Sequence, residues 1–288
     1  MAEKTTMKKV GILYHSQNEP AHVLAEKLKT LLVVYDASAW LCSAWDEDNA
    51  VNQLDNTELI ITIGGDGTIL RAAQVALKNR IPITGINMGN LGFMTELKAG
   101  EAEEILAEIL EGKGWIDERA MLETTIIGEQ PKAKYFALND VALARGIDVR
   151  MVSIEVGVNN EYFTTYRADG VVISTATGST GYSLSAGGPI LYPGSRDLLL
   201  TPLLSHFSLR HSMVLSPDTT IKLKIRTPVP AALSIDGHTS RKIEDGTEIV
   251  IKRSKYITRF LRIHPPEHFY GALEQKLKGK QINETRKS

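Results

Sequence analysis

A Gly-Gly-Asp-Gly-Thr segment at residues 64–68 has the residue types and spacing that point most directly to chemistry. The apolar run 59–63 precedes it and the run 69–73 follows it, so we expect a turn from a buried strand into a helix. Glycines in such a turn let the backbone adopt positive φ and let a ligand approach main-chain N–H groups. The helix directs the positive end of its dipole at the same point. The segment is therefore predicted to hold phosphate groups.

Asp66 distinguishes this segment from a loop that only binds phosphate. A carboxylate repels a phosphate unless a cation lies between them or the carboxylate takes part in the reaction, so we interpret Asp66 as the reactive group. The alternative is a tight turn in which glycine serves only conformation and Asp66 caps the helix, a role worth about 1 kcal/mol. The segment lacks the Gly-Lys-Ser/Thr ending of a P-loop and the third glycine of a dinucleotide-binding fingerprint. It is therefore a phosphate loop of another type.

The composition is that of a globular protein without a bulk charge that would attract a polyanion. The 288 residues include 33 Lys and Arg against 34 Asp and Glu, and this net charge of -1 gives no electrostatic reason to bind nucleic acid or a membrane surface. Cys42 is the only cysteine, which excludes an intrachain disulfide and a cysteine-based zinc cluster. Residues 1–9 are too polar for a signal peptide, and no run reaches the roughly 18 residues of a membrane span. His264 and His268 lack an obvious third metal ligand. We expect a cytoplasmic protein whose side chains do not form a metal site of their own.

The first 119 residues alternate strands with helices. We expect strands at 9–14, 33–35, 59–63 and 81–86 and helices at 20–32, 69–77 and 100–111. This alternation predicts an α/β domain with a Rossmann-like parallel sheet and a ligand site beyond the carboxyl ends of its strands. A second glycine-bearing loop, 87–93, follows one of these strands, so the two loops should face one crevice.

The pattern changes beyond about Ala120. Short strand candidates follow one another at 124–127, 135–138, 151–158, 162–166, 170–174, 220–226, 231–235 and 248–253. They predict an all-β, sandwich-like second domain. We therefore expect an α/β domain at 1–119, which carries the phosphate loop, and a β-rich domain at 120–256. The tail from about Lys276 is predicted to be disordered.

One stretch, 175–189, interrupts the strand pattern of the second domain. It is rich in Ser, Thr and Gly and carries Tyr182, a surface that suits a neutral, hydrogen-bonding ligand such as a nucleoside. The alternative is a flexible Ser/Gly-rich loop. Apolar runs at 171–173 and 189–191 place the stretch inside a folded domain and favour a binding role.

With GGDGT in the α/β half and TGSTGYSLSAGGP in the strand-rich half, the chain resembles the NAD kinase family, which phosphorylates the 2′-hydroxyl of the adenosine ribose of NAD. Further matching blocks are 87–93 with Thr95-Glu96, Asn139-Asp140, 167–170, Thr201-Pro202 and 234–237. The resemblance implies that Asp66 accepts the proton of the ribose hydroxyl. It also implies that phosphate groups are held by Gly64, Gly65, Gly67 and Thr68, with Arg71 one helical turn on. A divalent cation, Mg²⁺ or another, would offset the repulsion between Asp66 and the phosphates of ATP.

The resemblance implies an NAD site and an oligomer as well. The matching NAD positions are Asn139, Asp140, Arg150, Arg167, Asp169, Thr177, Thr180, Gly181, Tyr182, Ser183, Ser185 and His238. Asp140 stands where the family has Glu, one methylene longer, which leaves its contact with the ribose open, and Gly181 stands where the family often has Ala. The family resemblance implies that the domain at 1–119 binds the phosphate donor and that the segment at about 257–288 returns to it. It implies that the domain at 120–256 binds NAD and forms the contacts of a homodimer or homotetramer, in which the strand-rich domains pack together.

Other functions carry related loops. A lipid kinase of the diacylglycerol kinase type also has GGDGT, and a phosphofructokinase-like sugar kinase has a related GGDG loop. The hydroxyl-rich residues 177–185 favour a nucleoside acceptor, and no basic amphipathic helix for a membrane surface is evident. A nucleotide-binding regulator without catalysis is the third alternative, against which Asp66 argues. The sequence leaves open whether NAD or NADH is preferred, and whether ATP, another nucleotide or polyphosphate is the donor.

Overall fold

The computed structural model describes residues 7–89, 92–131, 133–146, 150–205, 210–271, 273–274 and 277. The chain forms two compact units, Met1–Glu118 with Thr258–Ser288, and Arg119–Ile257. The tail that we expected to be disordered lies outside the described residues apart from Leu277. Among the helices of the described ranges, none is both long enough and apolar enough to cross a membrane.

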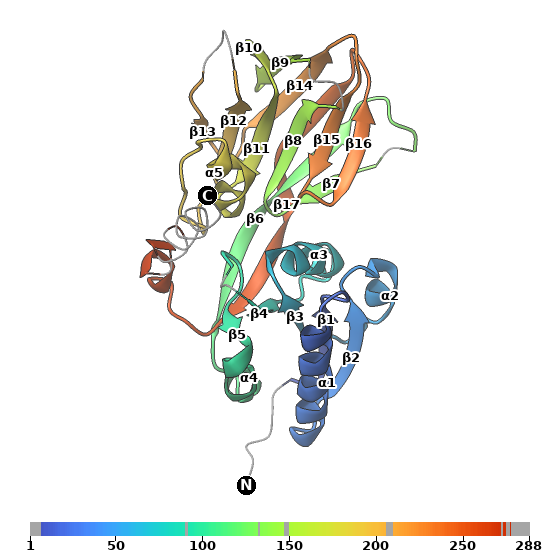
Figure 1. Cartoon of the computed structure of the whole chain (residues 1–288), viewed down its shortest axis with the longest axis vertical. Helices are drawn as coiled ribbons and strands as arrows, with labels where there is room; N and C mark the ends of the chain where they lie inside the picture. The colour runs from blue at the N-terminus through green and yellow to red at the C-terminus, as the bar shows by residue number, and fades with distance from the viewer. Residues whose placement is uncertain are drawn as a thin grey trace, which may run out of the picture. The chain divides into compact units, whose positions relative to one another are not determined.

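A parallel sheet forms the centre of the first unit (Figure 1). Its strands, in spatial order, are β2 (Ser38–Ser43), β1 (Lys9–Tyr14), β3 (Leu59–Gly64) and β4 (Ile83–Asn87), and all neighbours are parallel. The short β5 (Leu97–Lys98) pairs with the end of β4, and Phe260 of β17 (Glu248–Arg262) pairs with Ile83 at its start. Every residue of β3 and β4 is buried, as expected for parallel strands covered on both faces.

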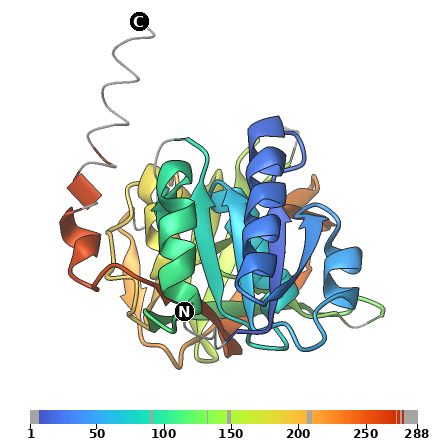
Figure 2. The same cartoon turned by 90° about the horizontal axis from the view of Figure 1, so that it is seen from below.

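Helices pack on this sheet. They are α1 (Glu19–Val34), α2 (Glu47–Asn52), α3 (Asp66–Ala76) and α4 (Ala102–Leu110), the last preceded by a 3-10 turn, Ala99–Glu101. α1 and α4 lie on the same face of the sheet (Figure 2), where Leu28 and Leu106 join one apolar cluster with Ile12 and Ile61. α3 follows β3 directly, and this junction carries the GGDGT segment.

The strand expected at 33–35 is wrong. α1 continues through Val34, and after a turn at Asp36, whose φ is 61°, the chain enters β2 instead. Val34 is exposed, whereas Trp40 and Cys42 of β2 are buried at alternate positions. The strand signal was therefore the period-two alternation of Trp40 and Cys42, and the apolar run before it was the end of a helix.

The second unit is a β-sandwich. Its strands are most of β6 (Trp115–Ile126), β7 (Tyr135–Ala137), β8 (Asp140–Arg145), β9 (Val152–Val158), β10 (Glu161–Ala168), β11 (Gly170–Thr175), β12 (Leu198–Leu203), β13 (Met213–Leu215), β14 (Thr220–Arg226), β15 (Ala231–Ile235), β16 (Thr239–Ile243) and most of β17. One antiparallel sheet has the order β13-β12-β11-β8-β15-β16. The other contains β10-β9-β14-β17, with β6 paired to β17 and β7. One apolar core draws on both sheets, with Leu143 and Ile173 from the first and Ile154 and Leu223 from the second.

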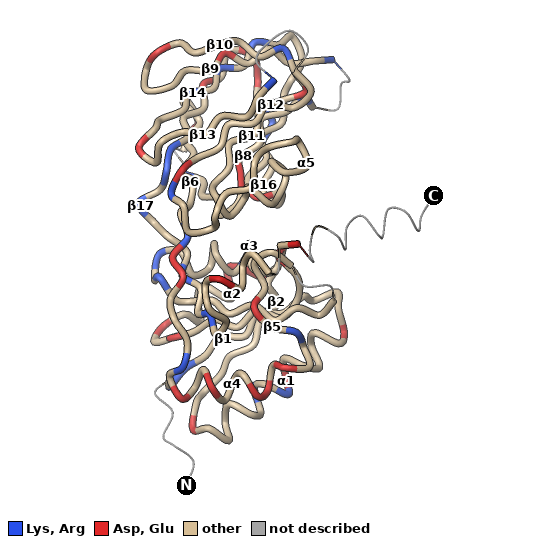
Figure 3. Tube along the Cα trace, turned by 90° about the vertical axis from the view of Figure 1, so that its left-hand side faces the viewer, with Lys and Arg blue, Asp and Glu red and all other residues tan. Residues whose placement is uncertain are grey.

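The expected fold class, an α/β domain followed by a β-sandwich, is confirmed. The elements that the sequence pattern did not predict are α2, β5, β8, β12, β13 and β16, besides β2. The 175–189 stretch contains a 3-10 turn, Thr177–Thr180, and the short α5, Tyr182–Ser185, so the flexible-loop alternative is wrong. In each unit, acidic and basic residues are interspersed along the trace (Figure 3), in keeping with the net charge of -1.

Candidate functional site

The GGDGT segment is the junction between β3 and α3. Gly65 is the N-cap of α3, with φ -112° and ψ -168°. None of the three glycines of the segment has a positive φ, so the expectation that they serve a positive-φ turn is wrong. Gly64 is required by packing, because a Cβ there would overlap Thr68 Oγ1. A Cβ on Gly65 or Gly67 would meet nothing within 4 Å. Neither conformation nor internal packing explains these two glycines, and the space beside them is open to a ligand.

Asp66 does not cap α3. The helix has no side-chain cap bond, and the carboxylate instead accepts the N–H of Phe93 on Oδ2 at 2.9 Å and that of Met94 on Oδ1 at 3.1 Å. A Cβ on Gly92 would overlap this carboxylate, so the backbone of the second loop lies directly against it. The capping alternative is therefore wrong, and the expectation that the two glycine-bearing loops meet is confirmed for the described part of the second loop. Residues 90 and 91 lie outside the described residues.

Two further side chains of the first unit adjoin this junction. Thr68 is 1% exposed, and its Oγ1 atom has no hydrogen-bond partner, which leaves a buried acceptor and donor at the first turn of α3. Arg71 Nη1 lies 3.0 Å from Glu47 Oε1, and its guanidinium sits over the ring of Trp45 at 4.8 Å. Glu47 and Trp45 therefore orient the cation that the sequence analysis assigned to phosphate. Nothing in the spacing of the sequence pairs these residues.

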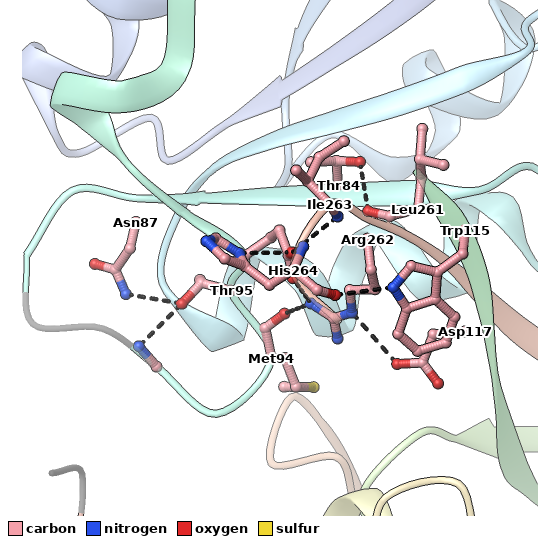
Figure 4. A network of polar contacts seen from close by, with 12 residues as sticks. Thr84, Asn87, Met94, Thr95, Trp115, Asp117, Leu261, Arg262, Ile263 and His264 are labelled. Atoms are coloured by element: carbon pink, nitrogen blue, oxygen red, sulfur yellow. Dashed lines mark hydrogen bonds and ion pairs between the residues drawn. The ribbon is translucent and has the colours of Figure 1, made fainter. Parts of the chain in front are cut away.

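A buried polar network lies beside the second loop (Figure 4). Glu96 Oε1 accepts the N–H groups of Ile263 at 3.0 Å and His264 at 2.8 Å, and its Oε2 lies 3.0 Å from Arg262 Nη1. Burial acts to raise the pKa of Glu96, but the Arg262 charge and the donors from 263–264 outweigh it, so this pKa lies below its usual value. Glu96 is therefore a buried anion that ties the C-terminal segment to the loop.

Asp236 organises the entry to β8 in the second unit. Its Oδ1 accepts the N–H groups of Asn139 at 2.8 Å and Asp140 at 3.1 Å, and its Oδ2 accepts that of Leu138 at 2.8 Å. Asp236 is 7% exposed, and burial raises its pKa to about 7 against the opposing effect of the three donors. The Asn139-Asp140 pair is therefore fixed at its backbone by a carboxylate that sequence reasoning gave no role.

The side chains of this pair lie next to the 175–189 stretch. Asp140 is buried, which raises its pKa to about 6, and the backbone N–H of Tyr182 opposes this shift. Asn139 Oδ1 is buried without a hydrogen-bond partner. A Cβ on Gly178 would overlap the backbone of Asn139, so the two segments touch through main chain. An unpaired amide oxygen and a desolvated carboxylate mark a place where a polar ligand can bind.

Comparison with known proteins assigns the family. Residues 6–114 match the ATP-NAD kinase N-terminal domain, and residues 138–263 match the ATP-NAD kinase C-terminal domain. The chain belongs to the ATP-NAD kinase family. The resemblance drawn from the sequence is thereby confirmed.

Relatives within the ATP-NAD kinase family match nearly the whole chain. The NAD kinase of Dehalococcoides mccartyi strain CBDB1 is 44% identical over 274 residues, 94% of this chain and 96% of its own. That of Chloroflexus aurantiacus strain J-10-fl is 33% identical over 273 residues, 94% of this chain and 99% of its own. The crystal structure of an Archaeoglobus fulgidus NAD kinase in complex with ATP has a TM-score of 0.75 at 26% identity, covering 91% of this chain and 97% of its own. Yeast NADH kinase complexed with NADH shares the fold, with a TM-score of 0.84 at 23% identity and coverage of 94% and 88%.

The residues predicted for NAD in this family member all belong to the second unit, but they differ in exposure. Thr180 and Ser183 are buried and use their hydroxyls within the chain, on Thr177 O at 3.2 Å and Thr201 Oγ1 at 2.9 Å. Thr177 is also buried and accepts from Arg119 Nη1 at 3.3 Å. Tyr182 and Ser185 are exposed, and Gly181 is partly buried. The surface offered to a ligand is therefore narrower than the hydroxyl-rich sequence suggested.

The remaining residues predicted to bind NAD are less buried. Arg150 and Arg167 are exposed. Asp169 Oδ1 lies 3.3 Å from Arg145 Nε, and His238 Nδ1 lies 3.4 Å from the carbonyl oxygen of Asp236. No group of three or more His, Cys, Asp or Glu that could hold a metal occurs within the described ranges. The assignment of these residues to NAD stays a prediction.

Proposed function

We propose that this chain is an NAD kinase that transfers the terminal phosphoryl group of ATP to the 2′-hydroxyl of the adenosine ribose of NAD, with Asp66 as general base. One observation carries the proposal. The Asp66 carboxylate stands at a glycine-rich strand-to-helix junction, is partly exposed, and is held by two backbone N–H groups instead of capping its helix. A carboxylate so placed is available to a substrate as well as to the turn 92–94.

Asp66 supplies what the acceptor alcohol lacks. A ribose hydroxyl is a poor nucleophile at neutral pH, and a carboxylate that accepts its proton during attack removes this barrier. The N–H groups of Phe93 and Met94 hold one oxygen each, which fixes the plane of the carboxylate and leaves the remaining lone pairs for the substrate hydroxyl. Orientation of this kind is the main protein contribution to phosphoryl transfer.

The residues proposed to bind the phosphate groups of ATP lie at the same junction between β3 and α3. Gly65 and Gly67 leave open space where phosphate oxygens can approach the N–H groups of the first turn of α3. Thr68 Oγ1, buried and unpaired, can donate to one of these oxygens, and the absence of a Cβ at Gly64 leaves the space that this hydroxyl occupies. Arg71, oriented by Glu47, adds a positive charge on the same helix. These residues are our candidates for the donor phosphates.

The side chains of the junction fit a divalent cation that arrives with the nucleotide better than one coordinated by protein ligands alone. Mg²⁺ keeps several waters and is often bound through one or two carboxylates and substrate phosphates. Asp66 is the single carboxylate in the junction, and no cluster of three candidate ligands occurs in the described ranges. When bound, the ion would offset the repulsion between Asp66 and the phosphates and stabilise the charge of the transferring group.

NAD is proposed to bind in the second unit at Asn139 and Asp140. The unpaired Asn139 Oδ1 can accept from the adenine amino group or from a ribose hydroxyl, and Asp140 can accept from a hydroxyl. Tyr182 and Ser185 are exposed and belong to the stretch that contacts this pair, so a ligand can reach them directly. Arg150, Arg167, Asp169, Thr177, Thr180, Gly181, Ser183 and His238 are proposed to line or shape the same site.

A homodimer or homotetramer is proposed as the working assembly. Met151, Tyr162, Leu204 and Val214 of the second unit are large apolar side chains that are exposed in the single chain. Exposed apolar groups of this kind are often covered in an oligomer. Light scattering after size exclusion tests this, and a monomer at micromolar concentration would contradict it.

The deciding experiment measures NADP formation from NAD, ATP and Mg²⁺ by purified protein, detected with an NADP-specific dehydrogenase. Product from the wild type and not from Asp66→Asn supports both the reaction and the base. Polyphosphate and NADH are tested in parallel as alternative donor and acceptor. If the wild type binds NAD and forms no product with any pair, the protein is a nucleotide-binding regulator; if it phosphorylates diacylglycerol instead, it is a lipid kinase.

A further inference from the structure

Arg262 reaches the loop that holds Asp66 from the last position of β17 (Figure 4). Its Nη1 atom donates to the carbonyl oxygen of Met94 at 2.8 Å. The N–H of the same residue donates to Asp66 Oδ1 at 3.1 Å. A single residue, Met94, therefore connects the guanidinium to the carboxylate, although Arg262 and Met94 are 168 residues apart in the sequence.

The guanidinium itself is firmly held. Nη1 also lies 3.0 Å from Glu96 Oε2, Nε lies 3.3 Å from Asp117 Oδ2, and the group sits over the ring of Phe260 at 4.5 Å. Arg262 is 6% exposed. A planar guanidinium with partners on two sides has little freedom to rotate, so its bond to the Met94 carbonyl has a fixed direction.

The loop is anchored on its other flank as well. Thr95 Oγ1 accepts the N–H of Gly92 at 2.9 Å and the amide of Asn87 at 3.3 Å. Glu96 accepts the backbone N–H groups of Ile263 and His264, which ties this flank to the segment that carries Arg262. The turn 92–94 is therefore fixed between Asp66 and the end of β17.

Charge balance alone does not explain the contact with Met94. Two carboxylates, Glu96 and Asp117, already neutralise the single guanidinium, and the carbonyl adds no countercharge. The bond to Met94 O instead fixes the peptide whose neighbouring N–H groups orient Asp66. A displacement of about 1 Å at a reacting group is enough to lower a rate by about a hundredfold.

We propose that Arg262 is a positioning residue for phosphoryl transfer, which acts through Met94 to keep the N–H groups of Phe93 and Met94 on the Asp66 carboxylate. The inference rests on the proposed function of Asp66 as the general base. Glu96 supports Arg262 in this role, while Asp117 binds the side of the guanidinium that faces away from the chain of contacts to Asp66.

Arg262→Lys and Asp117→Asn form a matched pair for the test. Lysine keeps the buried positive charge, but its single nitrogen cannot serve Met94, Glu96 and Asp117 together, so kcat is expected to fall about ten- to a hundredfold. The dissociation constant for NAD, measured by equilibrium titration, is expected to stay unchanged. Asp117→Asn disturbs the same guanidinium and leaves the Met94 bond, so its kcat is expected to stay within about twofold. Equal losses of kcat in the two variants at equal loss of Tm would overturn the proposal in favour of a purely structural role.

A double-mutant cycle shows whether Arg262 acts through Asp66. In an Asp66→Asn background, Arg262→Lys is expected to lower the residual NADP formation by less than about twofold, because the group that it positions is gone. The same fold loss in both backgrounds would overturn the proposal. If Arg262→Lys does not fold, Glu96→Gln replaces it, since loss of the charge that fixes Nη1 is expected to lower kcat in the same way.

Amide hydrogen exchange gives a readout that does not depend on turnover. The N–H groups of Phe93 and Met94 are expected to exchange faster in Arg262→Lys than in the wild type or in Asp117→Asn. Unchanged exchange would overturn the positioning role whether or not the enzyme is active. Absence of NADP formation by the wild type would instead contradict the proposed function, so the two failures can be told apart.

Discussion

Asp66 in the first unit and Asp236 in the second are held in the same way but differ in exposure. Asp66 accepts N–H groups from two residues of the turn 92–94, and Asp236 accepts them from three consecutive residues that lead into β8. Asp66 remains partly exposed, whereas Asp236 is 7% exposed. A carboxylate that collects the N–H groups of a neighbouring segment fixes that segment in both units. Asp66, the more exposed of the two, is the one that we assign to a substrate.

Replacement of Asp66 by Asn is expected to have the largest effect, and on catalysis alone. Loss of the base should lower kcat by a factor of about 10² to 10⁴, or roughly 3 to 5 kcal/mol in the barrier. The free energy of unfolding should change by less than about 1 kcal/mol, because Asn keeps one acceptor oxygen for the buried Met94 and the N–H of the partly exposed Phe93 can bind water. Steady-state kinetics, NAD titration and thermal unfolding measure the three quantities. A kcat within tenfold of the wild type would contradict the role of Asp66.

The same change at Asp236 is expected to act on stability and NAD binding. An amide presents two donors, so at least one of the three N–H groups at 138–140 loses its acceptor in a buried place, at a cost of about 1 to 3 kcal/mol. The KM for NAD should rise because Asn139 and Asp140 shift, while kcat at saturating NAD changes little. Urea unfolding and kinetics measure this. If Asp236→Asn instead lowers kcat as strongly as Asp66→Asn does, the contrast between the two carboxylates is wrong.

The part of the site that could be predicted from the sequence depends on residues close to one another in the chain. The apolar run before GGDGT and the glycines themselves located Asp66 at the end of a strand, and the alternation of elements predicted that the loop after β4 would lie beside it. Physical reasoning also found Asp66 unsuited to phosphate binding alone. These conclusions need only neighbours in the sequence and the rule that parallel strands end at one edge.

What the sequence could not predict depends on contacts between distant segments. No local pattern joins Arg262 to Met94, or Asp236 to residues 138–140. One signal at Asp236 was available. Asp-Gly after the strand β15 is a turn sequence, and Asp236 adopts a positive φ of 50°, which few residue types tolerate. The strands β8 and β12 are buried over most of their length and lack alternation, and an apolar run of this kind does not by itself distinguish a strand from a helix.

Gly92 and Gly178 test the same difference between the two units, with smaller expected effects. A Cβ on Gly92 would overlap Asp66, and a Cβ on Gly178 would overlap the backbone of Asn139. Gly92→Ala is therefore expected to lower kcat by about tenfold, about 1.4 kcal/mol in the barrier, with the KM for NAD unchanged. Gly178→Ala is expected to raise the KM for NAD with kcat little changed. Gly65→Ala, where a Cβ meets nothing within 4 Å, is the control for folding. Equal effects of both alanines on kcat would contradict the separation of roles.

The smallest expected effect is on the pH dependence of stability, and it arises from burial in the second unit. Burial raises the pKa of Asp140 to about 6 and that of Asp236 to about 7, above the ordinary aspartate value of 3.8. Between about pH 4 and about pH 7 the folded chain thus keeps protons that the unfolded chain has released. These two groups therefore make the free energy of unfolding fall as the pH rises through this range.

The Asp236→Asn variant has no titratable group at position 236. Its free energy of unfolding should therefore fall less between about pH 5 and about pH 7 than that of the wild type. Urea unfolding of the two proteins over this range measures the difference, in which the contributions of other carboxylates such as Glu96 cancel. Equal slopes would mean that the three N–H donors outweigh burial and keep Asp236 ionised. Asp236 would then be a buried anion fixed by backbone donors, and exposure to substrate would be the main difference left between it and Asp66.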